Sequence, residues 1–504
     1  MKRSSLSLRQ YNWTEAWLPM WPLALAIFMA ICIARLPLWF AVALILVSSL
    51  FFLTLIQPLI GIGVALIAGP LGAYENIFFG NLPLESGQLF FFVAVAGWLA
   101  RGVLERRIII HRTAINIPLA IFIVVASLTL LDAVSLAFGI KELVKWLELA
   151  IAMFMVVDLS LDGSKSRDLG HKIDRFVPNK RRTRAVLAIL LVAGVSQAII
   201  GIWQFGIRGE GPDHFVILDR FYRAFGTFMQ PNPFGGLMGV SASLAIGTLA
   251  GLVMGFAATR RRRATQPLSE WVWFGFVAIC AALSSMALLM SWSRGAWLGF
   301  AAAMAVLILF LPKRRWIGIL LLILIMVLFF VSLQLGIMPQ SILARAGSLG
   351  TDLQIEDVRG EYVTIENYAL VERLAHWQAG LNMARENLWT GVGFGNYERA
   401  YADYSLLNWS IALGHAHNYY INILAEVGVI GALAYVLLWV AIFIQVIRIL
   451  KHNEWPQRGM ALGLVAAWTA ISVHHAVDKL YVNNMFIYFG VMLGLQQILD
   501  VRND

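Results

Sequence analysis

The sequence predicts an all-α polytopic membrane protein with 12 to 14 transmembrane helices. Hydrophobic residues make up 60% of the 504 residues and charged residues only 13%. The mean hydropathy is +0.74, which is well above the values typical of soluble proteins. Many apolar runs reach the ~20 residues that a helix needs to cross a bilayer. We therefore expect residues 1–504 to form a single integral membrane domain.

The candidate spans follow one another along the whole chain. They cover approximately residues 17–34, 38–56, 57–73, 87–100, 114–133, 141–160, 185–206, 233–256, 270–290, 295–312, 316–335, 417–447, 459–477 and 483–499. The first run follows three basic residues and lacks a small-residue cleavage pattern, which predicts a retained signal anchor. The third run is interrupted by Pro58, Pro70 and several glycines, so a re-entrant segment is an open alternative there.

The distribution of charge predicts the orientation in the membrane. Most of the 39 lysines and arginines lie at the two termini and in segments 101–112, 164–184, 260–263, 313–315 and 448–458. Because basic loops stay on the cytoplasmic side, both termini are expected in the cytoplasm. The net charge of +10 is then a signature of topology and of contact with membrane lipids. It does not indicate a nucleic-acid partner.

One large segment, residues 336–416, is predicted on the outer side. Within it, apolar residues recur at helical spacing from about 366 to 386, which predicts an amphipathic helix. We expect this helix to lie over a cavity as a lid. The glycines at 391–395 do not indicate a nucleotide-binding loop, because no strand precedes them and no helix pattern follows.

On this outer side, where cations are scarce, four arginines stand at the ends of apolar runs or in patterned segments. They are Arg220, Arg223, Arg294 and Arg373. Each one alone is equally consistent with contact to lipid headgroups. Together they favour an anion-binding site. The two prolines that flank Asn232 predict a rigid turn close to the first two arginines.

A stretch beginning at His417 and Asn418 opens a long apolar run. At 100° per residue, His417, Gly428 and Gly431 fall on one stripe of a helix. The two glycines would leave that stripe bare, so another helix could approach closely. An imidazole at the mouth of such a groove suggests a functional site. The pairs His474-His475 and Asp478-Lys479 are less informative about function. The two cysteines lie in apolar runs and form no metal or disulfide pattern.

These motifs resemble those of the bacterial O-antigen ligase family and its Wzy-type polymerase relatives. The spacing His417-Asn418, nine residues, Gly428, two residues, Gly431 resembles the family signature. Segments 220–236, 291–299 and 372–397 also resemble the family pattern and occur in the family's order. The resemblance covers roughly residues 185–450, and the earlier spans match only in hydropathy.

The resemblance implies a GT-C-like glycosyltransferase in the bacterial inner (plasma) membrane, with its active site facing the periplasm. Such enzymes transfer a glycan from undecaprenyl diphosphate to a hydroxyl of lipid A-core or of another glycan, with no metal and no cofactor. His417 would activate the acceptor, since an imidazole accepts a proton near neutral pH. The four arginines would bind the diphosphate, because guanidiniums pair with phosphate oxygens. The supporting residues would be Asn232, Asn418, Gly428 and Gly431.

The alternative is a secondary transporter or a lipid or polysaccharide flippase. The interrupted third span and the intramembrane residues Lys145, Glu148 and Glu426 support it. No internal repeat pairs broken helices in two halves, and the large outer segment is unusual for a transporter. Ligase and polymerase activity are not distinguished by the sequence.

Overall fold

Helices form nearly all of the regular structure in the computed structural model. It describes residues 24, 26–28, 30–31, 36–80, 84–106, 110–164, 175–218, 220–261, 265–337, 343, 357–364, 367–406 and 408–501. The helices are α3 (Leu38–Ile56), α4 (Pro58–Ala68), α5 (Gly72–Phe79), α6 (Ser86–Leu104), α7 (Asn116–Leu128), α8 (Leu136–Ser160), α9 (Lys180–Gly206), α10 (Pro231–Arg261), α11 (Leu268–Met290), α12 (Arg294–Phe310), α13 (Arg315–Gln334), α15 (Tyr368–Glu386), α16 (Tyr397–Tyr404), α17 (Tyr419–His452), α18 (Gln457–His475) and α19 (Met485–Asp500). Most of the predicted first span, 17–34, lies outside the described residues.

Among the described residues, eight helices are long and apolar enough to cross a membrane. They include α3, the stretch Pro58–Phe79, α6, α9, α10, α11, α13 and α17. Three shorter apolar helices lie at Asn116–Asp132, Arg294–Phe310 and Met485–Asp500. The predicted class, an all-α polytopic membrane protein, is confirmed. The full number of crossings, the single domain and the orientation stay predictions.

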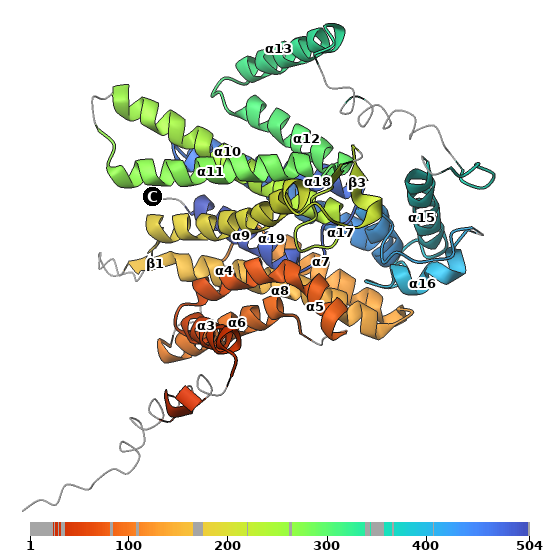
Figure 1. The fold of residues 1–504 in the computed structure, drawn as a ribbon, viewed down its shortest axis with the longest axis horizontal. Coiled ribbons are helices and arrows are strands. Elements are labelled where there is room, and N and C mark those ends of the chain that lie inside the picture. The colour runs from red at the N-terminus through yellow and green to blue at the C-terminus, as the bar shows by residue number, and fades with distance from the viewer. Residues whose placement is uncertain are drawn as a thin grey trace, which may run out of the picture.

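The helices run roughly along one direction, and the two ends of the bundle differ (Figure 1). Helices α15 and α16 of the outer segment lie at one end, beside the start of α17. The hairpin of β1 (Leu161–Ser164) and β2 (Arg175–Pro178) lies at the other end with the C-terminus. A second small hairpin joins β3 (Val216–Ile217) to β4 (Phe221–Tyr222). The apolar patterns predicted neither hairpin.

The centre of the bundle depends on close contact between α10 and α18. A Cβ on Gly251 would lie 2.5 Å from Gly459 Cα, and one on Gly247 would lie 2.2 Å from Gly463 N. The backbones therefore touch at two levels, as small residues at four-residue spacing permit. This contact fixes α18, whose C-terminal end carries His474.

Helix α15 occupies the predicted position, but the buried face differs from the predicted one. The large residues Leu370, Leu374 and Trp377 are only half-buried, whereas Ala375, His376, Ala379, Gly380 and Met383 are buried. A Cβ on Gly380 would lie 2.8 Å from the Ile421 side chain of α17. Small residues thus allow α15 to pack closely on α17, and His376 is turned inward with them. Whether α15 acts as a lid stays a prediction.

Candidate active site

His417 lies just before α17 and has an unusual backbone conformation. Asn418 is the N-cap of α17, and its side chain accepts hydrogen bonds from the backbone N–H groups of Tyr420 and Ile421 at 3.0 and 3.2 Å. This capping explains why the helix begins here. His417 has φ of 52°, in the left-handed region that side chains other than glycine rarely adopt. Such residues persist where their surroundings hold them and are common at active sites.

A hydrogen bond to the side chain of His415 holds this backbone conformation. The backbone N–H of His417 donates to His415 Nδ1 at 3.0 Å. Burial lowers the pKa of His415 to about 3, so its ring is neutral near pH 7. Since Nδ1 accepts, the single ring proton is on Nε2. His415 and His417 lie side by side because neither residue is helical.

Both imidazoles face Asp478, which lies between α18 and α19. His415 Nε2 and His417 Nδ1 are each 3.8 Å from Asp478 Oδ1, and the two rings are 4.5 Å apart. Burial alone would raise the pKa of this carboxyl. The facing His417 and His415 outweigh burial and hold the pKa of Asp478 below its usual value. A carboxylate beside His417 orients the ring and stabilises its protonated form.

Asp478 is held in place by its neighbours on both sides. Its backbone N–H donates to His474 O at 3.0 Å, and its Oδ1 accepts from Lys479 N at 2.8 Å. The Lys479 ammonium is buried and pairs with Glu142 of α8 at 3.0 Å. Glu142 also pairs with Lys145 at 2.8 Å. These ion pairs tie the Asp478 segment to α8.

A third histidine approaches His417 from the outer segment. The rings of His376 and His417 have centroids 5.6 Å apart. His376 stacks on Tyr401 with centroids 4.6 Å apart, and Tyr397 Oη donates to the backbone oxygen of His376 at 2.8 Å. Burial, with His417 nearby, lowers the pKa of His376 to about 4. This neutral histidine forms an ordered wall of the site.

Two of the predicted arginines are joined through Asn232. Arg223 donates to Ser291 O at 3.0 Å and to Asn232 Oδ1 at 3.4 Å. Asn232 Oδ1 also accepts from Ser293 Oγ at 2.9 Å. Ser293 is the N-cap of α12 and is followed at once by the half-buried Arg294. The rigid turn at Asn232 therefore brings Arg223 to the turn that carries Arg294.

His474 connects this arginine turn to the Asp478 cluster. A Cβ on Gly295 would lie 3.4 Å from His474 Nε2, so the residue after Arg294 contacts the histidine ring. Arg373 of α15 lies within electrostatic range of the same ring. His474 in turn bonds the Asp478 backbone. The turn that carries Arg294 and the segment that carries Asp478 therefore both contact His474, and Arg373 acts on the same ring electrostatically.

Arg220 lies apart from this region. It is exposed, and its guanidinium is 5.4 Å from the ring of its neighbour Phe221. Among the described residues, no contact joins Arg220 to Asn232, His474 or Asp478. The structure therefore joins Arg223 to the turn that carries Arg294, brings Arg373 within electrostatic range of His474, and leaves Arg220 at the edge.

Gly428 and Gly431 do not form the predicted groove for another helix. Gly428 has φ of 61° and ψ of −167° and interrupts α17. A Cβ there would lie 2.3 Å from Trp389 C. The N–H of Val429 donates to Leu388 O at 2.8 Å. The partner is therefore an outer-segment loop that enters the break and satisfies the backbone groups freed by it.

The His415, His417 and Asp478 donor atoms lie within 4.8 Å of one another, which is a spacing compatible with a metal ion. The tautomer of His415 does not suit metal binding. Its Nε2 carries the proton, whereas a histidine ligand must present a deprotonated nitrogen. The arrangement therefore fits a hydrogen-bonded cluster better than a metal centre.

Sequence reasoning did not place His376 or His415 in the site, and it set aside His474 and Asp478 as less informative. All four are visible as polar residues at predicted outer ends of spans or in the outer segment. The predicted topology put them on one side of the membrane, which was the available signal. Their convergence depends on α18 and α15 packing beside α17, and periodicity does not specify that packing.

Residues 279–436 match a family model described as O-antigen ligase. The match spans the second half of α11 through the first half of α17, and it includes Arg294, Arg373 and His417. Asp478 and the Arg223–Asn232 turn lie outside it. No curated protein matched the chain. The resemblance to the O-antigen ligase and Wzy-type polymerase superfamily is confirmed by the family match over residues 279–436.

Proposed function

We propose that this chain, which carries an O-antigen ligase domain, is a metal-independent membrane glycosyltransferase. Its donor is a glycan linked to undecaprenyl diphosphate. Its acceptor is a hydroxyl group, either on lipid A-core or on another glycan. The reaction takes place at the periplasmic face of the bacterial inner membrane, where the predicted topology puts residues 336–416.

The arrangement of His417 and Asp478 carries this proposal. Neither ring nitrogen of His417 has a hydrogen-bond partner among the described residues, and Nδ1 faces Asp478 at 3.8 Å. With Nδ1 protonated and directed at the carboxylate, Nε2 is the basic nitrogen. It accepts the proton of the acceptor hydroxyl, and Asp478 stabilises the imidazolium that forms.

The transfer requires stabilisation of the leaving diphosphate. The acceptor oxygen forms a bond to the anomeric carbon, and the bond from that carbon to the phosphate oxygen breaks. The electron pair of the broken bond stays on the diphosphate, where negative charge increases. Arg223, Arg294 and Arg373 supply guanidiniums for this charge, a task that a divalent ion performs in many other enzymes.

A transfer assay tests the proposal. The purified protein is incubated with undecaprenyl-diphosphate glycan and candidate acceptors in the presence of EDTA. His417→Ala should lower the rate by about 10²–10⁴-fold while donor binding persists. His417→Gln preserves hydrogen bonding but is not a base, so it should be equally slow. A glutamine variant that works at nearly the wild-type rate would remove His417 from the chemistry.

Asp478→Asn provides a second test of the pair. An amide can still contact the ring but does not stabilise its positive charge, so the rate should fall by at least about tenfold with little change in the donor KM. The same experiments separate the enzyme from the alternative, a transporter or flippase. In sealed vesicles, movement of the lipid-linked glycan across the bilayer without any transfer would favour the alternative.

A further inference from the structure

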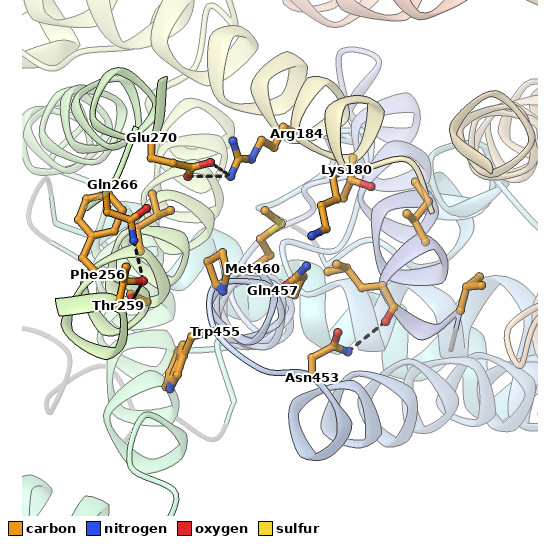
Figure 2. Close-up of a pocket in the computed structure, with 17 residues that line it drawn as sticks. Lys180, Arg184, Phe256, Thr259, Gln266, Glu270, Asn453, Trp455, Gln457 and Met460 are labelled. Atoms are coloured by element: carbon orange, nitrogen blue, oxygen red, sulfur yellow. Dashed lines mark hydrogen bonds and ion pairs between the residues drawn. The ribbon is translucent and has the colours of Figure 1, made fainter. Parts of the chain in front are cut away.

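A pocket of about 400 Å³ lies at the end of the bundle remote from His417 (Figure 2). It is enclosed by the first turns of α9, α11 and α18 and by the last turns of α10, α17 and α19. The part of α17 that follows its break at Gly428 extends to His452, and its length is roughly 36 Å at 1.5 Å per residue. The pocket is therefore separate from the proposed transfer chemistry.

The mouth of this pocket is basic, and its cations are only partly neutralised. Arg184 uses one nitrogen, Nη2, to donate to both oxygens of Glu270 at 2.8 Å. Its Nε and Nη1 form no hydrogen bond with another residue that the structure describes. Lys180 is exposed, extends toward the inside of the pocket in Figure 2, and has no ion pair with any described carboxylate. Uncompensated donors are therefore available to an anion.

The inner wall of the pocket is apolar. Leu252, Met460, Ile498 and Leu499 line it, and all four are buried in the bundle. Trp455 lies at the rim, where aromatic residues commonly mark the level of lipid headgroups. A ligand that fits must therefore be amphipathic, with an anionic group toward Lys180 and Arg184 and an apolar part toward Leu499.

The surrounding surface is mostly basic, although Glu454 and Asp500 also lie beside the pocket. Arg181, Arg182, Arg260 and Lys451 lie on the helix ends next to the pocket. Because the helices cross a membrane, this basic end lies at the headgroup level of one leaflet. Basic pockets between helices at that level bind anionic headgroups.

We propose that this pocket binds the phosphate headgroup of an anionic phospholipid. Lys180 and the free donors of Arg184 contact the phosphate, and the glycerol and first acyl carbons pack on the apolar wall. The volume lies within the range of small-molecule sites.

The test measures binding of phosphatidylglycerol to the full-length protein in detergent by native mass spectrometry, with phosphatidylcholine as the neutral reference. Lys180→Gln should weaken phosphatidylglycerol binding about fivefold, as expected for ~1 kcal/mol per basic residue. Arg181→Gln is the matched control. It removes the same charge from an adjacent exposed residue that does not line the pocket, and it should weaken binding much less than Lys180→Gln does.

A second variant tests the pocket by its shape. A Cβ on Gly255 would meet its nearest neighbours, Trp455 and Pro456, only at 4.0 Å, so Gly255→Leu should fold and fill the space. It should reduce phosphatidylglycerol binding without a change in charge. Equal losses in Lys180→Gln and Arg181→Gln, or full binding by Gly255→Leu, would overturn the proposed site. Competition by inorganic phosphate alone as strong as that by the lipid would overturn the lipid as its ligand.

Discussion

Replacing Gly428 with alanine distinguishes the broken α17 from a continuous helix. In a continuous helix, Gly428→Ala would be neutral or stabilising, since alanine is favoured over glycine by ~1 kcal/mol in a helix interior. In the structure, Gly428 has φ of 61° and ψ of −167°. That conformation is essentially restricted to glycine. The two descriptions of α17 therefore predict opposite signs for the same substitution.

The expected cost has two parts. Holding alanine in this backbone conformation costs about 1–3 kcal/mol. The added Cβ would also lie 2.3 Å from Trp389 C and 2.5 Å from Thr390 N, so the loop backbone must move away. This displacement loses the hydrogen bond from Val429 to Leu388, which contributes about 1 kcal/mol. The total is about 2–4 kcal/mol of lost stability.

Thermal unfolding in detergent measures this loss, with two control variants. Gly209→Ala has positive φ, at 70°, but nothing within 4 Å of the added Cβ, so it isolates the backbone strain. Gly275→Ala is inside α11 and also has open space, so it should be neutral or stabilising. The melting temperature should decrease in the order Gly275→Ala, Gly209→Ala, Gly428→Ala. A Gly428→Ala protein as stable as Gly275→Ala would refute the break in α17.

Three further predictions follow from the site. Arg294→Ala should reduce the rate of glycan transfer roughly ten- to a hundredfold, and Arg294→Lys should recover only part of that rate. Arg220→Ala should reduce the rate less than about fivefold. Glu142→Gln leaves the Lys479 ammonium buried and unpaired, so stability should fall by about 3–5 kcal/mol in a melting experiment, and adding Lys479→Met should restore part of it. The pKa of His376 in the folded protein is about 4. Below about pH 6.5, the unfolded chain therefore binds a proton at this residue that the folded protein does not bind. His376 should therefore contribute a loss of about 1 kcal/mol of stability per pH unit toward pH 4, beside that of His415, and His376→Phe should reduce the total slope by this amount.

Positions along the chain were predictable because they depend on local patterns. The start of α17 follows from the capping Asn418, and the span 38–56 coincides with α3 because twenty apolar residues have few alternatives to a helix in lipid. The helix at 368–386 was also expected from its spacing. Its buried face was not, because helical periodicity favours the large residues, whereas close packing on α17 selected the small ones around Gly380.

The sequence by itself determined the membrane class, the boundaries of most spans, and the candidacy of His417 and the outer arginines. These features follow from composition, from the period of the helix and from the sign of loop charges, all of which are local. Only the tertiary structure decided that Asp478 faces His417, that His415 holds its backbone, and that Arg223 bonds the turn before Arg294 while Arg220 stays apart. Apart from the contact between His415 and His417, these contacts connect residues more than fifty positions apart through the packing of α10, α12 and α18. The physical reason is that a one-dimensional pattern specifies which face of a helix is apolar, and packing against other helices specifies what that face meets.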